Sequence, residues 1–202
     1  VKQVAQASQL LNPDARISFD AVLGELLQEH ADTALGMNTS DSQMFIRMYW
    51  EILNTSSDWE YHQTTVSETA LWRGYERVVW FERGVGRMRA LAAGQERDKG
   101  RDRQGVNSWG KKGVGVSLMG SLPAALYLGT KFDNNIGTIV PKAEQHLPAI
   151  WCFCSSPEYN EAVRQIDQSL KVTNATLVKV PFDLAHWQQV AAERYPHGLP
   201  EP

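Results

Sequence analysis

The sequence predicts an α+β fold with a helical N-terminal part. Three observations support this class: apolar residues recur at helical spacing near both ends of the chain, apolar and polar residues alternate between residues 58 and 82, and Gly, Pro and Asn interrupt residues 113–141. Strands and helices do not alternate regularly, as they do in a βαβ series. We therefore expect a small twisted sheet, mixed or antiparallel, with helices packed on it.

Two helices are expected in the first quarter of the chain. The first spans residues 18–36 and ends at Gly36, and the second spans residues 40–53 and begins at Ser40 or Asp41. We therefore expect residues 1–56 to form a helical connector and residues 57–202 to form a second unit. Each helix has one apolar stripe. The stripe residues are Phe19, Val22, Leu23, Leu26 and Leu27 in the first helix and Phe45, Met48, Tyr49 and Ile52 in the second.

The middle of the chain predicts short strands, because apolar residues alternate there or form short runs between turn residues. The expected strands lie within residues 58–66, 75–82, 113–120, 124–129 and 135–141.

The last third of the chain predicts three helices and one strand. Residues 147–156 are apolar all round and predict a buried helix. The next helix, over residues 156–170, has Ser156 as its cap and Pro157 at its first position. Residues 175–182 predict a strand. The helix over residues 183–198 is capped by Asp183 and stopped by Pro196 and Gly198.

The net charge of −3 is unevenly distributed along the 202 residues. From Leu71 to Lys112 there are eleven Lys or Arg and five Asp or Glu, a local charge of +6, whereas the other residues carry nine basic and eighteen acidic side chains, a charge of −9. One basic segment on an acidic body predicts a localised contact with a polyanion. No run approaches the roughly 18 apolar residues of a membrane-spanning helix, so no membrane partner is expected.

The cysteines Cys152 and Cys154 are separated by one residue, which argues against a disulfide framework and against a zinc site. They predict buried thiols in a reducing cytoplasm. The N-terminus has no signal-peptide pattern. Because the chain begins without Met and stops at "HGLPEP", we expect a segment of a longer protein.

Motifs of catalysis and of cofactor binding are missing from the sequence. It contains no phosphate-binding loop, complete dinucleotide fingerprint, nucleophile elbow or calcium loop, and "RGVGRM" offers only a lone Gly-x-Gly. No catalytic or metal-binding residue is predicted. No two of the five histidines have the sequence spacing of a metal-binding motif. They are His30, His62, His146, His186 and His197.

The stretch from Arg83 to Gly113 is basic and rich in glycine. Its Arg and Lys side chains predict contacts to DNA phosphates or guanine edges, and nearby Asn and Gln side chains predict contacts to adenine. The alternative is that residues 95–104 form a mobile, solvated loop. Four aromatic residues are expected to anchor the stretch: Trp72, Trp80, Phe81 and Trp109. The candidate DNA-binding residues are Arg83, Arg87, Arg89, Arg97, Lys99, Arg101, Arg103, Gln104, Asn107, Lys111, Lys112, Asn134 and Asn135.

Two segments, "NSWGKKGVGVSLMGSLPAALYLGTKFDNNIGTIVPK" and "HLPAIWCFCSSPEYNEAVRQID", resemble the target-recognition region of large adenine-specific DNA methylases of restriction-modification and phage-defence systems, including the type IIG arrangement. The matching features are Trp109-Gly110, the strand from Gly113 to Val116, the Phe132-Asp-Asn-Asn135 strand, and the helix from Leu147 to Ser156. "NPDARI" near the start and the last 25 residues also look like flanking segments of such proteins.

The resemblance implies double-stranded DNA as a partner and a methyltransferase domain in the same parent chain. The family's Asn/Asp-Pro-Pro-Tyr/Phe loop and its glycine-rich S-adenosylmethionine motif are absent from this sequence. We therefore expect no cofactor in this chain, S-adenosylmethionine in the parent protein, and methyl transfer to a flipped adenine outside the chain. The alternative is a protein-interaction segment that links the methylase to other defence subunits. The acidic N-terminal part and Trp50, Trp59 and Trp187, expected to be exposed, favour it.

Overall fold

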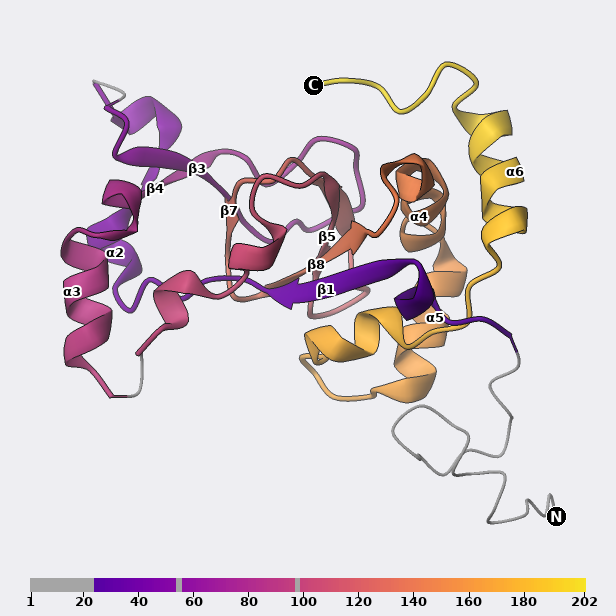
Figure 1. The fold of residues 1–202 in the computed structure, drawn as a ribbon, viewed down its shortest axis with the longest axis horizontal. Helices are drawn as coiled ribbons and strands as arrows, with labels where there is room; N and C mark the ends of the chain where they lie inside the picture. Colours follow the sequence, from indigo (N-terminus) through magenta and orange to yellow (C-terminus); the bar gives the residue numbers. More distant parts are fainter. Residues whose placement is uncertain (1–23, 54–55, 97–98) are drawn as a thin grey trace, which may run out of the picture.

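The computed structural model describes residues 24–53, 56–96 and 99–202, which form two four-stranded sheets with helices at both ends (Figure 1). The predicted α+β class, with antiparallel and mixed sheets, is confirmed. The central sheet has the antiparallel order β1–β8–β5–β6. Its strands are β1 (Ala31–Leu35), β5 (Gly113–Ser117), β6 (Ala124–Tyr127) and β8 (Ile136–Pro141).

The central sheet is the core of the molecule. All residues of β5 and β6 are buried, which explains why these strands form apolar runs instead of alternating with polar residues. Val114 of β5 lies between Leu126 of β6 and Ile139 of β8. These three side chains belong to the larger apolar cluster, together with the buried face of the helix that follows β8.

Three helices lie at one end of the molecule, where the first of them packs against the central sheet and the other two pack against the first (Figure 1). They are α4 (Leu147–Cys154), α5 (Pro157–Ile166) and α6 (Leu184–Arg194). The predicted caps are confirmed, since the Ser156 hydroxyl accepts from the main chain of Tyr159 and the Asp183 carboxylate accepts from the main chain of His186. Cys152 and Cys154 lie in α4 as free, buried thiols, as expected. Burial raises the pKa of both thiols.

The second sheet lies at the other end, with order β2–β4–β3–β7 (Figure 1). Its strands β2 (Ile46–Met48), β4 (Arg77–Trp80) and β3 (Trp59–Gln63) are antiparallel, and β7 (Lys131–Phe132) runs parallel to β3. Two helices, α2 (Ser42–Phe45) and α3 (Arg87–Gly94), lie beside it. A small apolar cluster joins them: Met37, Phe45, Val79, Phe81 and Met88.

Short 3-10 helices complete the described part of the chain. They are η2 (Leu27–Glu29), η3 (Tyr49–Glu51), η4 (Glu82–Gly84), η5 (Arg101–Arg103), η6 (Val106–Ser108), η7 (Glu144–His146) and η8 (Asn174–Val178). Within the residues that the structure describes, no helix combines the length and the apolar character needed to cross a bilayer.

The prediction of two helices near the N-terminus is wrong for the residues that the structure describes. Residues 1–23 lie outside the described part, but residues 31–35 form β1, an edge strand of the central sheet, because β8 supplies its hydrogen-bonding partner. Over residues 40–53, helix α2 ends after one turn and the chain becomes β2, which pairs with β4. Only the Asp41 cap is confirmed there. Residues 24–53 are therefore part of the two sheets and do not form a helical connector.

The strand expected over residues 175–182 is also wrong. The chain forms η8, in which Thr176, Leu177 and Val178 are buried. Leu177 packs against Gly137 of β8, where an added Cβ atom would crowd the Cδ1 methyl of Leu177. The apolar run is therefore explained by burial against the central sheet, and the run pairs in the manner of a strand only at Pro181, through an isolated antiparallel bridge to Leu26.

Candidate nucleic-acid interface

The basic segment, defined here as residues 83–112, folds into a compact arm against the second sheet. It begins in η4, continues through α3 and returns through η5 and η6. Gly100 and Gly105 precede the two returning 3-10 helices and have φ values of +80° and +81°, a conformation that favours glycine. Apart from residues 97 and 98, which are outside the described part, this segment has defined structure and is not simply a solvated loop.

Three of the predicted DNA-binding arginines hold the arm together. Arg89 Nη1 donates to both carboxylate oxygens of Asp102, at 2.9 and 3.3 Å, and the Asp102 side chain is 1% exposed. Arg103 donates to the carbonyl of Gly84 at 3.0 Å. Arg83 donates to the hydroxyl of Ser57 at 2.9 Å. The contact between Arg89 and Asp102 joins α3 to η5 and fixes the distance between the two halves of the arm.

Four other predicted cations are exposed: Arg87, Lys99, Lys111 and Lys112. Arg101 is half-buried, and its carbonyl accepts from the main chain of Asn38 at 3.0 Å. Gln104 is half-buried and Asn107 is exposed, whereas Arg97 lies outside the described residues. Exposed cations on an arm that is held by hydrogen bonds and an ion pair are suited to binding phosphate, because few side-chain motions of the scaffold are lost on binding.

The predicted asparagines lie in the turn between β7 and β8. Asn135 donates from its amide to Asp133 and accepts from Lys171, each at 2.8 Å, so its amide is engaged within the fold. The main-chain carbonyl of Asn134 also accepts from Lys171. Asn134 and Asn135 both line a polar cavity of about 280 Å³ together with Asn38, and of the two only the Asn135 amide is bonded within the fold among the described residues. Asn134 is therefore better placed than Asn135 to contact a ligand.

Lys131 anchors the end of the arm to the second sheet. Its ammonium lies 3.8 Å from the ring centre of Trp109 and 4.7 Å from that of Phe81, and it pairs with Glu60 at 2.9 Å. The Phe81 and Trp109 rings meet edge to face, with their centres 5.4 Å apart. The predicted anchoring role of Phe81 and Trp109 is confirmed. Trp72 instead packs against the larger cluster, and Trp80 packs against the smaller one.

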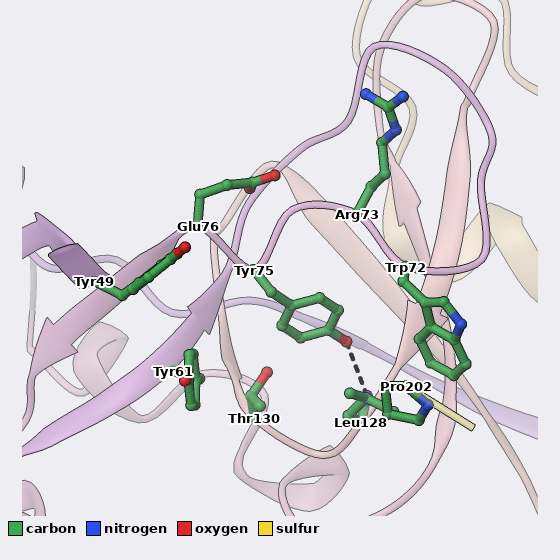
Figure 2. A pocket seen from close by; sticks show the side chains of 9 residues that line it. All are labelled: Tyr49, Tyr61, Trp72, Arg73, Tyr75, Glu76, Leu128, Thr130 and Pro202. Carbon is green, nitrogen blue, oxygen red and sulfur yellow. Dashed lines mark hydrogen bonds between the residues drawn. The ribbon is translucent and has the colours of Figure 1, made fainter.

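An aromatic pocket of about 420 Å³ opens between the two sheets (Figure 2). Tyr75 forms its floor, because its hydroxyl donates to the carbonyl of Leu126 at 2.8 Å and accepts from the main chain of Leu128 at 3.0 Å. Burial raises the pKa of Tyr75. No motif in the sequence indicates this pocket, because its walls come from segments far apart in the chain. The lining residues are Tyr49, Tyr61, Trp72, Arg73, Tyr75, Glu76, Leu128, Thr130 and Pro202.

His62 is fully buried in β3, and neither ring nitrogen has a hydrogen-bond partner among the described residues. Burial lowers its pKa from 6.5 to about 4; the charge of Arg77 acts in the same direction, and that of Asp133 opposes it. His62 is therefore neutral at physiological pH. Among the residues that the structure describes, no group of acidic, His and Cys side chains could hold a metal ion.

We expect His62 to make the stability of the protein depend on pH. Its folded pKa lies below its unfolded value, so its contribution is fully present above pH 6.5 and is lost as the pH falls from 6.5 towards 4. Between pH 7 and pH 5 the free energy of unfolding should fall by about 2 kcal/mol from this group. Urea unfolding at both pH values measures the loss. The His62→Gln variant should lack this part of the pH dependence, and an unchanged dependence would contradict the assignment.

No protein-family model matches this chain, and no curated protein matches it. The arm, its exposed cations and its partly buried ion pair are therefore the basis on which a function can be assigned.

Proposed function

We propose that this chain is the DNA-recognition segment of an S-adenosylmethionine-dependent adenine-N6 methyltransferase of a restriction-modification or phage-defence system. It would bind duplex DNA in the cytoplasm and position the target adenine for a catalytic domain outside this chain, where the cofactor also binds. The arrangement of the basic arm carries the proposal. Arg89 and Arg103 bond within the arm, while Arg87, Lys99, Lys111 and Lys112 are exposed on its surface.

The charge distribution supports a local contact with DNA. The arm is basic and the rest of the chain is acidic, so a polyanion is attracted to the arm and repelled elsewhere. Lys99, Lys111 and Lys112 can neutralise phosphates, which fixes the register of the protein on the duplex without reading bases. Asn107, which is exposed, and Asn134 are candidates for contacts to adenine.

Replacing Lys99, Lys111 and Lys112 with Gln tests this proposal. If each lysine neutralises one phosphate, the slope of log K against log salt concentration should become shallower by about 2.7 for B-DNA. Fluorescence polarisation of a mixed-sequence duplex at several salt concentrations measures the slope. The affinity should fall to a similar extent for duplexes of different sequence, because phosphate contacts carry no sequence information.

A charge-matched control carries Gln at Lys142, Lys179 and Arg194, which are distant in sequence from the arm and lie near helices α4–α6. It should retain the slope of the unmodified protein. Equal slopes for the two triple variants would overturn the assignment of the arm. Thermal unfolding of both variants verifies that the fold is retained.

A second function is favoured by an exposed apolar surface on α2 and η3. Exposed fractions there are 53% for Met44, 52% for Tyr49, 59% for Trp50 and 104% for Leu53. Such a surface suits contact with another protein, here the methyltransferase domain or a defence subunit. Of the three tryptophans expected to be exposed, only Trp50 is, since Trp59 and Trp187 are half-buried. Failure to bind DNA at low salt, with Trp50-dependent association with the parent's other domains, would favour this function.

A further inference from the structure

A second cavity, of about 310 Å³, lies between helix α2, the second sheet and the first turn of α3. It combines two tryptophans with two arginines, and none of the described acidic side chains lines it. The pairing of β2, β3 and β4 and the start of α3 bring its walls together from separate parts of the sequence. The lining residues are Met44, Phe45, Arg47, Trp59, Trp80 and Arg87.

The aromatic wall consists of Trp59 and Trp80. They lie directly opposite each other in the antiparallel β3–β4 pair, with ring centres 5.1 Å apart and planes tilted by 59°. Both side chains are half-buried, so each ring still has accessible surface. The indole Nε1 of Trp80 is buried and has no acceptor among the described residues. A buried donor without a partner is uncommon in folded proteins, and it suits a ligand that brings an acceptor.

The cationic wall consists of Arg47 and Arg87. Arg47 donates from Nη1 to the carbonyls of Gln43 and Ile46, which positions the guanidinium at the cavity while Nε and Nη2 stay available among the described residues. Arg87 is exposed and is the first residue of α3. The neighbouring carboxylate of Glu82 accepts from the main-chain N–H of Arg87 at 2.6 Å and so caps the helix. Two guanidinium groups beside indole rings match a phosphate next to a flat ring.

We propose that this cavity binds one unpaired nucleotide, with its base against Trp59 and Trp80 and its phosphate on Arg47 and Arg87. A cavity of this volume is within the range of small-ligand sites. The proposal rests on the proposed DNA-binding function and adds a site for a nucleotide outside the double helix. A nucleotide in a DNA strand and a free nucleotide share this chemistry, so the experiment includes both.

The pocket of Figure 2 suits a nucleotide less well, although it is larger and also aromatic. Its only arginine, Arg73, pairs with Glu68 at 2.5 Å, and its lining includes Glu76. The cation there is neutralised, and the second carboxylate repels phosphate. The charge around the two pockets therefore favours the cavity of Arg47 and Arg87 as the phosphate site.

The test compares a fully paired duplex with the same duplex carrying one unpaired dA, by fluorescence polarisation on the intact chain. We expect the unpaired nucleotide to tighten binding by about tenfold, because stacking of one base on aromatic side chains contributes on that scale. Arg47→Gln and Arg87→Gln should each reduce this difference, because each removes a cation that holds the phosphate of the stacked nucleotide. Trp80→Phe keeps a ring for stacking but removes Nε1, so it should lose only part of the difference. Arg194→Gln serves as the control, and thermal unfolding checks the fold of each variant.

The outcomes separate this proposal from the proposed function. Binding of both duplexes with equal affinity, or a preference that Arg47→Gln and Arg87→Gln leave unchanged, overturns the nucleotide site and leaves DNA binding intact. Failure to bind either duplex contradicts the proposed function. In that case titration with dAMP and with inorganic phosphate tests whether the cavity binds a free nucleotide. If dAMP binds and Arg87→Gln weakens its binding, the cavity is a site for a free nucleotide. If dAMP does not bind, the proposal is overturned.

Discussion

Alanine in place of Gly36 is expected to destabilise the protein by about 3 kcal/mol or more, because the added methyl group overlaps main-chain atoms that cannot move independently. A Cβ atom at this position would lie 2.0 Å from the carbonyl oxygen of Asp133 and 2.6 Å from that of Phe132. Gly36 also donates from its main chain to the carbonyl of Ile136, and Met37 donates to Phe132. The substitution would therefore push β1 away from the chain that links β7 to β8.

The control for this prediction is Gly94→Ala. Gly94 is the last residue of α3, and nothing lies within 4 Å of the position that a Cβ atom would take. Alanine has the higher helix propensity, so this variant should be neutral or stabilised by up to about 1 kcal/mol. Urea unfolding of both variants gives the two free energies. Equal stability of Gly36→Ala and the unmodified protein would show that the two segments separate easily at this point.

Gly36 is also a position where the structure differs from the prediction made from the sequence. It was expected to end a helix, and helical spacing of apolar residues did favour one over residues 18–36. The position instead requires glycine because two main-chain segments approach closely. Whether Ala31–Leu35 becomes a helix or a strand depends on β8, which lies more than a hundred residues later. Periodicity within one segment contains no information about such a partner.

Other elements could be predicted because their signals are local. Ser156-Pro157 and Asp183 begin α5 and α6 through contacts within one helical turn. The buried strands β5, β6 and β8 were recognisable as apolar runs between glycine, proline and asparagine residues. These signals are complete within a few residues of the element they specify, so no tertiary contact was needed to interpret them.

The candidate site, too, could be predicted from the sequence only in part. Composition identified the basic segment, but it could not distinguish a cation that binds a ligand from one that binds the protein itself. Arg83, Arg89 and Arg103 bond to partners between 13 and 26 residues away in the sequence. Arg47 and Trp59 were not predicted as site residues at all, because the cavity they share with Arg87 exists only once β2, β3 and β4 have paired.

The two sheets give the proposed interface its support. The second sheet contributes Phe81 next to β4 and Lys131 in β7, and the arm contributes Trp109, so these three residues connect sheet and arm. The hydroxyls of Ser108 and Thr138 are 2.8 Å apart and connect the arm to β8 of the central sheet. The arm is therefore attached to both sheets, and a ligand that binds its exposed cations binds a surface already fixed in position.

Replacing Arg89 with Met should destabilise the protein by about 3 kcal/mol, because a buried carboxylate loses the cation that compensates it. Asp102 is 1% exposed, and Arg89 is its side-chain partner among the described residues. Urea unfolding measures the loss. Adding Asp102→Asn to this variant should recover roughly half of it, because the uncompensated charge is then removed.

The control Arg87→Met changes the same residue type two positions earlier in α3, where the side chain is exposed, and should alter stability by less than about 0.5 kcal/mol. Composition alone cannot tell which arginine holds the arm together and which one contacts the ligand. The two variants separate these roles. If Arg89 holds the arm and Arg87 contacts the ligand, Arg89→Met lowers stability and Arg87→Met lowers DNA affinity. Equal effects of the two variants on stability would mean that the ion pair does not fix the arm. The exposed lysines would then lie on a surface that rearranges when DNA binds, and the salt dependence would include the cost of ordering it.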